Sequence, residues 1–147
     1  MNIKRIGAGN RMSEAVVFGG KVYLSGLVAV AAKGKSVKEQ TADILAQIDA
    51  ALNQAGSNKT LILKANIWLT NIATFAQMNE AWDAWVVAGQ TPARATVESK
   101  LAAPGLDVEI MVEAAIIARA ARPAAKKAAP AKKAKPVKKA AKKAKRK

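Results

Sequence analysis

The sequence predicts an α+β domain in which two helices pack on one face of a mixed sheet. Two observations carry this prediction. Short β-rich segments lie at both ends of residues 1–118, and between them two segments repeat apolar residues at helical spacing. The predicted order is several strands, a helix, a strand, a helix and two strands, which fits one layered domain. Residues 119–147 lack these patterns, so we treat them as a separate tail.

The N-terminal part predicts a run of short strands. The β-rich segments are residues 3–6, 15–18, 21–24 and 27–30. Gly19 and Gly20 separate two of them and predict a tight hairpin turn. Ser25 and Gly26 then interrupt the strand before Leu27.

The first helix has clear signals at both ends. Ser36 with Glu39 three residues later forms a capping-box pattern, and Gly56 predicts the C-terminal stop. One apolar face connects these ends, formed by Val37, Ile44, Leu45, Ile48, Ala51 and Leu52. Residues 61–70 then alternate, which predicts a strand with one buried face. The residues expected on that buried face are Leu63, Ala65, Ile67 and Leu69.

The second helix is predicted to begin at another capping-box pattern, Thr74 with Gln77, and to end at Gly89. Its apolar face consists of Phe75, Met78, Trp82, Trp85 and Val86. We favour packing against the sheet over ligand binding for this face. Two further strands are expected over residues 93–99 and 107–117.

The two helices leave the other face of the sheet to be covered. We expect this second face to mix apolar residues with polar and charged ones, namely Arg94, Thr96, Glu98, Glu109 and Glu113. A mixed surface fits contact with another subunit better than a second apolar layer. The pattern therefore predicts a homo-oligomer.

The net charge of +15 arises from 25 basic and 10 acidic residues, and it is unevenly distributed. Residues 119–147 contain 14 of the basic residues and no acid, so the body carries only +1. Ala, Lys, Pro and Arg make up nearly all of this tail, which predicts disorder in isolation. Its composition resembles that of linker-histone tails.

A polyanion is the expected partner of the tail, through counterion release. DNA and RNA are the main candidates, but the tail has no aromatic, Asn or Gln side chain with which to read bases. The alternatives are a membrane surface or no dedicated partner.

Several classes of protein are excluded by residues that the chain lacks. It contains no Cys and no His, which excludes disulfide scaffolds, thiolate chemistry and histidine-based triads or metal sites. It also has neither a run of about 18 apolar residues nor the apolar segment of a secretion signal. We expect a cytoplasmic protein without a metal or cofactor, with association to the nucleoid through the tail as an option.

The candidate site centres on Arg94 and Glu109. Arg94 begins a predicted strand directly after Pro92, where it is well placed to bind a carboxylate in a bidentate way. Glu109, on the following strand, is suited to orienting water or moving a proton. The alternative is a structural ion pair between these two residues on neighbouring strands.

The same segment resembles the signature of the RidA/YjgF family of reactive-intermediate (enamine/imine) deaminases. The resemblance rests on Pro-Ala-Arg at residues 92–94, a strand ending in Glu98, a short Pro loop and Val-Glu-Ile at residues 108–110. Further matches cover residues 23–26, 40–49, 66–69 and 75–79. Residues 45–59 and 78–85 are similar to the YoaB-like branch. The resemblance spans almost all of residues 1–118 and excludes the tail.

This resemblance implies a chorismate-mutase-like fold, a homotrimer and ligand clefts between subunits. It also implies hydrolysis of 2-imino or enamine acids to 2-keto acids and ammonia, without a cofactor or metal. By position, Arg94 matches a carboxylate-binding arginine and Glu109 a water-orienting glutamate. Ser25 and Asn79 match pocket residues that contact the substrate.

Two pocket positions depart from the family pattern. Met12 stands where a tyrosine is common, and Thr96 stands where many members have cysteine. The missing tyrosine hydroxyl bears on the substrate range and on turnover itself. A module that binds a carboxylate metabolite without turnover, with a tail that associates with nucleic acid, is therefore the alternative function.

Overall fold

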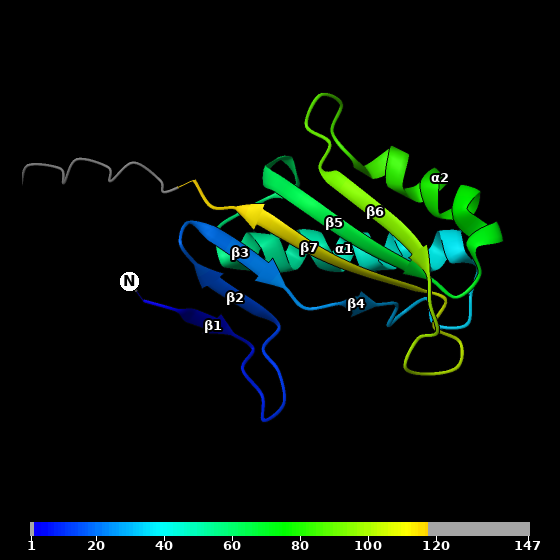
Figure 1. The fold of residues 1–147 in the computed structure, drawn as a ribbon, viewed down its shortest axis with the longest axis horizontal. Coiled ribbons are helices and arrows are strands. Elements are labelled where there is room, and N and C mark those ends of the chain that lie inside the picture. The colour runs from blue at the N-terminus through cyan, green and yellow to red at the C-terminus, as the bar shows by residue number, and fades with distance from the viewer. Residues whose placement is uncertain (1, 118–147) are drawn as a thin grey trace, which may run out of the picture.

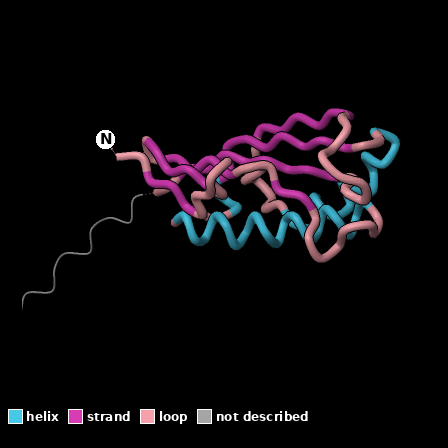
Figure 2. Tube along the Cα trace, turned by 90° about the horizontal axis from the view of Figure 1, so that it is seen from below, coloured by secondary structure: helices cyan, strands magenta, loops and turns pink. Residues whose placement is uncertain are grey.

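The computed structural model describes residues 2–117, and within them a single sheet carries two helices on one face. The helices are α1 (Val37–Ala55) and α2 (Phe75–Trp85). Figure 2 shows both of them on the same side of the strands. The predicted α+β architecture is confirmed, whereas the predicted disorder of the tail, residues 119–147, lies outside the described residues. No helix within residues 2–117 is both long enough and apolar enough to cross a membrane.

The sheet has seven strands with β7 near its centre (Figure 1). The strands are β1 (Lys4–Ile6), β2 (Ala15–Phe18), β3 (Lys21–Leu24), β4 (Leu27–Val28), β5 (Ile62–Leu69), β6 (Ala93–Glu98) and β7 (Val108–Ala115). Their order is β1-β2-β3-β7-β5-β6, and β4 also pairs with β7. Only the β5–β6 pair is parallel, which makes the sheet mixed.

The hairpin and the interrupted strand predicted near the N-terminus are both present. Gly19 and Gly20 connect β2 to β3 with φ values of 59° and 75°, which glycine adopts without strain. β3 and β4 pair with different parts of the same strand, β7. The break at Ser25 and Gly26 therefore separates two short strands that share one partner.

Helix α1 forms as its sequence predicts. The Ser36 side chain accepts from the Glu39 N–H while the Glu39 carboxylate accepts from Ser36, and Gly56 ends the helix at φ 83°. The buried face includes Ile44, Ile48 and Leu52, none of which is exposed to solvent. Each side chain of this kind stabilises a fold by about 1.5–3 kcal/mol relative to exposure. Local capping and burial therefore act together in this helix.

Helix α2 begins where predicted, directly after Thr74, but it lacks the predicted capping box and ends earlier than predicted. The 3-10 helix η2 (Ile72–Thr74) precedes it, and the Thr74 hydroxyl donates to the Asn71 carbonyl instead of capping the helix. The helix ends at Trp85 because Val86 is extended, and Gly89 belongs to the following turn. β-branched residues such as Val86 lose side-chain freedom in a helix, which favours this earlier end.

At the start of the strand β5, the buried and exposed positions differ from the predicted alternation, which holds only from Ala65 onward. A register shift between Ile62 and Lys64 leaves Leu63 45% exposed, although we predicted it on the buried face. Ile62 is buried instead. An extra residue in one strand of a pair is left unpaired, and this is invisible to a strict two-residue pattern.

The chain after β4 leaves the sheet because its backbone N–H groups donate to a carboxylate of α1. The Asp43 carboxylate accepts from the N–H groups of Val30, Ala31 and Ala32 at 2.8, 2.9 and 3.1 Å. These bonds, that from Ala32 foremost, lower the pKa of Asp43 below its ordinary 3.8. The predicted strand over residues 27–30 is therefore shortened to Leu27–Val28.

We expect Asp43→Asn to lower the free energy of unfolding by about 1 kcal/mol at neutral pH, because an amide is a weaker acceptor than a carboxylate. The folded-state pKa of Asp43 is depressed. Its stabilisation is therefore present above the unfolded pKa and lost as the pH falls through the folded one. Urea unfolding at neutral and acidic pH measures the difference, with Asp83→Asn, an exposed acid of α2, as the control. If Asp43→Asn lowers the free energy of unfolding by the same amount in acid as at neutral pH, the prediction is contradicted.

Candidate functional site

Arg94 and Thr96 lie on the side of the sheet that the helices cover. In the parallel β5–β6 register, Arg94 pairs with Ala65 and Thr96 with Ile67, and both of these partners are fully buried under the helices. Glu98 has the same orientation as Arg94 and Thr96. The prediction that Arg94, Thr96 and Glu98 share the open face with Glu109 and Glu113 is therefore wrong.

The Arg94 guanidinium is held in place by α2. Its Nη1 donates to the Asn79 Oδ1 at 2.9 Å, and its Cζ lies 5.1 Å from the Trp82 ring centroid and 5.7 Å from that of Phe75. Such stacking and hydrogen bonding fix the plane of a guanidinium. Within residues 2–117, every hydrogen bond that the group donates comes from Nη1. The Nε and Nη2 edge is therefore available for bidentate binding of a carboxylate.

The hydroxyl of Thr96 lies two residues along the same strand face. Its Oγ1 is buried and has no hydrogen-bond partner within the described part of the chain. A buried polar atom without a partner is costly, so native structures usually supply one. The Thr96 hydroxyl is thus available to a ligand or a water molecule beside Arg94.

Glu109 lies on the opposite face of the sheet, near the start of β7. It pairs with Val28 of β4 and Trp68 of β5, on the face opposite that of the buried Val108 and Ile110. A Cβ at Gly26 would collide with the Glu109 carboxylate, so the absent side chain of Gly26 makes room for it. Ser25 is half-buried beside this position.

The start of β7, and with it Glu109, is anchored to α1 by a buried amide. The Gln40 Oε1 accepts from the Asp107 N–H at 2.8 Å, and the Gln40 Nε2 donates to the Asp107 carboxylate at 2.9 Å. Thr70 donates to the other carboxylate oxygen at 2.9 Å. The strand therefore enters the sheet at a defined register two residues before Glu109.

Met12 lies apart from both Arg94 and Glu109. It is 58% exposed in the loop between β1 and β2, where its carbonyl accepts from the Gly9 N–H at 2.9 Å. Met12 therefore lies on the surface, away from the covered side of the sheet where Arg94 is held.

The six predicted site residues thus separate into two groups and one outlier. Arg94, Asn79 and Thr96 lie at the β6 edge on the helix side, whereas Ser25 and Glu109 lie on or beside the central strands. Because β5 lies between β6 and β7 and the side chains point to opposite faces, the alternative of an Arg94–Glu109 ion pair within one chain is excluded. Within the described residues, no three acidic side chains gather as they would around a metal ion.

Sequence reasoning missed three supporting residues. The helical pattern places Phe75 and Trp82 on a core-packing face, yet both rings also lie against the Arg94 guanidinium. Gly26 was interpreted only as a strand break, yet it accommodates Glu109. No local pattern marks these roles, because each depends on a residue more than ten positions away.

The open face of the sheet is mixed in character, as predicted, and of the five polar residues predicted there Glu109 and Glu113 do lie on it. Exposed or half-exposed aromatic and aliphatic side chains lie on it beside Glu109 and Glu113: Phe18, Tyr23, Trp68, Val97 and Met111. Phe18, Tyr23 and Val97 are 39%, 38% and 50% exposed. This face has the composition of a surface that contacts protein.

Comparison with known proteins places the body among established relatives. Residues 2–116 match the endoribonuclease L-PSP family. The RutC family protein YoaB of Escherichia coli K12 is 47% identical over 116 residues, covering 79% of this chain and all of YoaB. A crystal structure of a YjgF-family protein from Neisseria meningitidis has 47% identity and a TM-score of 0.77, covering 80% of this chain and 98% of that one. A YjgF/YER057c/UK114-family structure from Mycobacterium tuberculosis has 27% identity and a TM-score of 0.70, covering 78% of this chain and all of that one.

We expect Thr96→Val to leave the free energy of unfolding unchanged or to raise it by up to about 1 kcal/mol, because it removes a buried hydroxyl without a partner. Thr41→Val is the matched control, since the buried Thr41 hydroxyl donates to the Val37 carbonyl at 2.7 Å. The control should lose about 1 kcal/mol. Chemical unfolding compares the two variants. An equal loss in both contradicts the assignment of Thr96 as an open ligand position.

Proposed function

The chain belongs to the YjgF/RidA family, in its YoaB-like branch, and from this premise we propose that it hydrolyses small 2-imino or enamine acids to 2-keto acids and ammonia. Family membership by itself supports a RidA-like or endoribonuclease L-PSP-type function. The observation that carries the finer proposal is the guanidinium of Arg94, held by α2 with one edge free for a carboxylate.

The proposed site needs more than one copy of the chain. Arg94 and Glu109 point to opposite faces of one sheet, so they face a common substrate only if neighbouring copies bring the two faces together. The mixed open face of the sheet supplies a surface for that contact. We therefore propose a homotrimer with ligand clefts between subunits, the arrangement that the family resemblance implies.

In the proposed reaction the substrate carboxylate binds the Nε and Nη2 edge of Arg94, which fixes the position of the imine carbon. Glu109 from a neighbouring copy orients a water molecule, whose oxygen bonds to that carbon as its proton passes to the nitrogen. The C–N bond of the resulting carbinolamine then breaks as the hydroxyl proton passes to the nitrogen, which releases ammonia and leaves the 2-keto acid. Imines hydrolyse spontaneously, so positioning and one acid–base step of about 10²–10⁴-fold suffice.

Two other functions fit parts of the same site. Met12 lacks a hydroxyl, which favours the alternative of binding a carboxylate metabolite without turnover. An endoribonuclease activity, as the name of the matched family suggests, has less support from the residues, since the chain has no His for acid–base work near neutral pH.

We expect Arg94→Ala to lower kcat/KM for imino-acid hydrolysis by about 10- to 100-fold, the loss typical of a hydrogen-bonded charge pair. The assay follows ammonia release from an imino acid generated by an amino-acid oxidase, with Lys33→Ala, an exposed lysine in a loop, as the control. Should wild type and Arg94→Ala both match the uncatalysed rate, hydrolysis of these substrates is refuted. Stabilisation of wild type by a 2-keto acid in the same experiment would then support binding without turnover.

Gly26→Ala should lower kcat while changing stability little. The backbone φ of Gly26 is not positive, so Ala fits the chain, but its Cβ displaces the flexible end of Glu109. Adding Gly26→Ala to Glu109→Ala should then have no further effect, because no carboxylate remains to be displaced. Additive losses in this double-mutant cycle would show that Gly26 acts independently of Glu109.

A further inference from the structure

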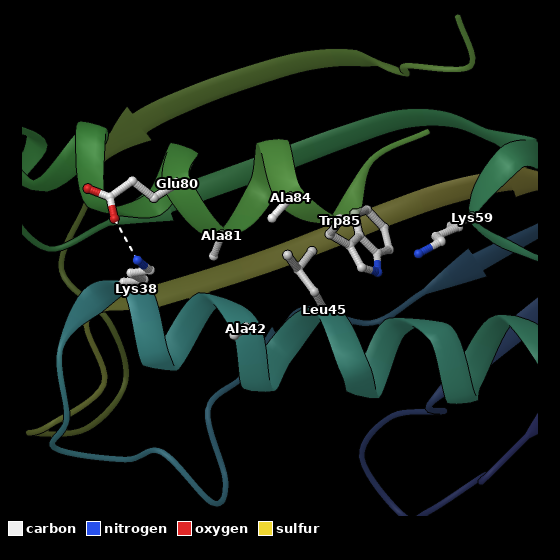
Figure 3. Close-up of a pocket in the computed structure, with 8 residues that line it drawn as sticks. All are labelled: Lys38, Ala42, Leu45, Lys59, Glu80, Ala81, Ala84 and Trp85. Carbon is white, nitrogen blue, oxygen red and sulfur yellow. Dashed lines mark ion pairs between the residues drawn. The ribbon is translucent and has the colours of Figure 1, made fainter. Parts of the chain in front are cut away.

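A groove of about 410 Å³ runs between α1 and α2, and its middle is apolar (Figure 3). The side chains of Ala42, Ala81 and Ala84 line this middle part, together with that of the buried Leu45. Sites for small molecules are typically of this size, with apolar walls and a few polar groups that fix the orientation of the ligand. The charged residues at the two ends of the groove therefore decide which ligand it suits.

An ion pair occupies one end of the groove. The Lys38 ammonium lies 2.8 Å from the Glu80 carboxylate, so the pair connects α1 to α2 (Figure 3). Glu80 is the one acid among the residues that line the groove. Because Lys38 already neutralises it, a ligand that carries a charge must find its partner at the other end.

An ammonium without an acidic partner lies at that other end. Lys59 is half-buried there, with its Nζ 5.4 Å from the ring centroid of Trp85. The ion pairs within residues 2–117 are those of Lys38 and Lys64, so Lys59 has no acidic partner in that part of the chain. Two lysines against one glutamate give the groove a net charge of +1, and the unpaired charge is that of Lys59.

Both groups at the Lys59 end are fixed by the fold. The Trp85 Nε1 donates to the Asp49 carboxylate at 2.9 Å, which sets the plane of the indole ring. Lys59 begins the 3-10 helix η1 (Lys59–Leu61), which the Asn58 side chain caps. A site whose groups are held in place before binding loses little conformational entropy when a ligand arrives.

We propose that the α1–α2 groove binds a small apolar monocarboxylate with a flat ring system. The ligand carboxylate accepts from the Lys59 Nζ, while its rings pack on Ala81 and Ala84 and against Trp85. One unpaired ammonium matches one negative charge, which favours a carboxylate over a phosphate of nearly two charges. This proposal does not depend on the imine chemistry.

The groove is separate from the Arg94 site and is accessible in the proposed assembly. Arg94 and two residues that hold it, Asn79 and Phe75, do not line the groove. The proposed contact between copies uses the face of the sheet opposite the helices, so the helix layer stays open to solvent (Figure 2). Binding in the groove and hydrolysis at Arg94 can therefore be tested independently.

Titration of the full-length protein with 2-naphthoate, followed by NMR at the Trp85 indole N–H, tests the proposal. We expect a saturable shift of this signal. The neutral analogue 2-naphthamide should bind about fivefold more weakly, because it lacks the charge that pairs with Lys59. Equal affinities for the acid and the amide, or no saturable shift with the acid, overturn the proposal.

Two pairs of matched variants locate the site. Lys59→Gln should weaken naphthoate binding about fivefold without changing that of naphthamide, whereas Lys33→Gln, an exposed loop lysine, should change neither. Ala42→Leu should weaken the binding of both compounds because the larger side chain fills the groove. Ala46→Leu, at an exposed position of α1 outside the groove, should leave both unchanged.

The same variants separate groove binding from other anion binding. Naphthoate binding that Arg94→Ala abolishes and Lys59→Gln leaves intact belongs to the Arg94 site, which overturns the proposal. An equal loss in Lys59→Gln and Lys33→Gln reflects general attraction to a basic protein and overturns it as well. Every variant retains the basic tail, so attraction of the anion to the tail contributes equally throughout.

Discussion

The alternation of side chains along β7 is the constraint on which the rest of the structure depends. Val108, Ile110, Val112 and Ala114 are almost fully buried beneath the helices, and strand geometry sends the residues between them to the opposite side. The hydrophobic core therefore dictates that Glu109 lies on the face that the helices leave open. A one-residue slip would bury that carboxylate in the core, so the register of β7 maintains fold and site together.

The parallel pairing of β6 with β5 places Arg94 on the other face, the one that the helices cover. It directs the arginine toward α2, where Trp82 contributes both to the core and to the orientation of the guanidinium. The two charged residues of the proposed reaction are thus built into opposite sides of one sheet. An activity that uses both residues requires assembly, which links the mixed open face of the sheet to the proposed chemistry.

Local signals succeeded where the interaction that they describe is itself local. The Ser36–Glu39 capping box and the Gly19–Gly20 turn each depend on neighbours within four residues, and both are present. The pattern at Leu63 failed because pairing with a distant strand decided otherwise, whereas Thr74 marks the start of α2 correctly without capping it. Asn71 draws the Thr74 hydroxyl into a preceding 3-10 turn, and the pairing of β5 with β7 absorbs an extra residue at Leu63.

The sequence by itself determined the identity of the elements, the division of charge between a nearly neutral body and a basic tail, and the candidate residues of the proposed site. Only the tertiary structure decided which side of the sheet each of them occupies. In β6 an apolar set (Ala93, Ala95, Val97) alternates with a polar one (Arg94, Thr96, Glu98), and hydrophobicity alone would turn the apolar set toward the helices. The structure does the opposite, because pairing with β5 sets the register and α2 offers Asn79 and two aromatic rings to the arginine. These partners belong to another element of the chain, so the alternation within one strand cannot predict them.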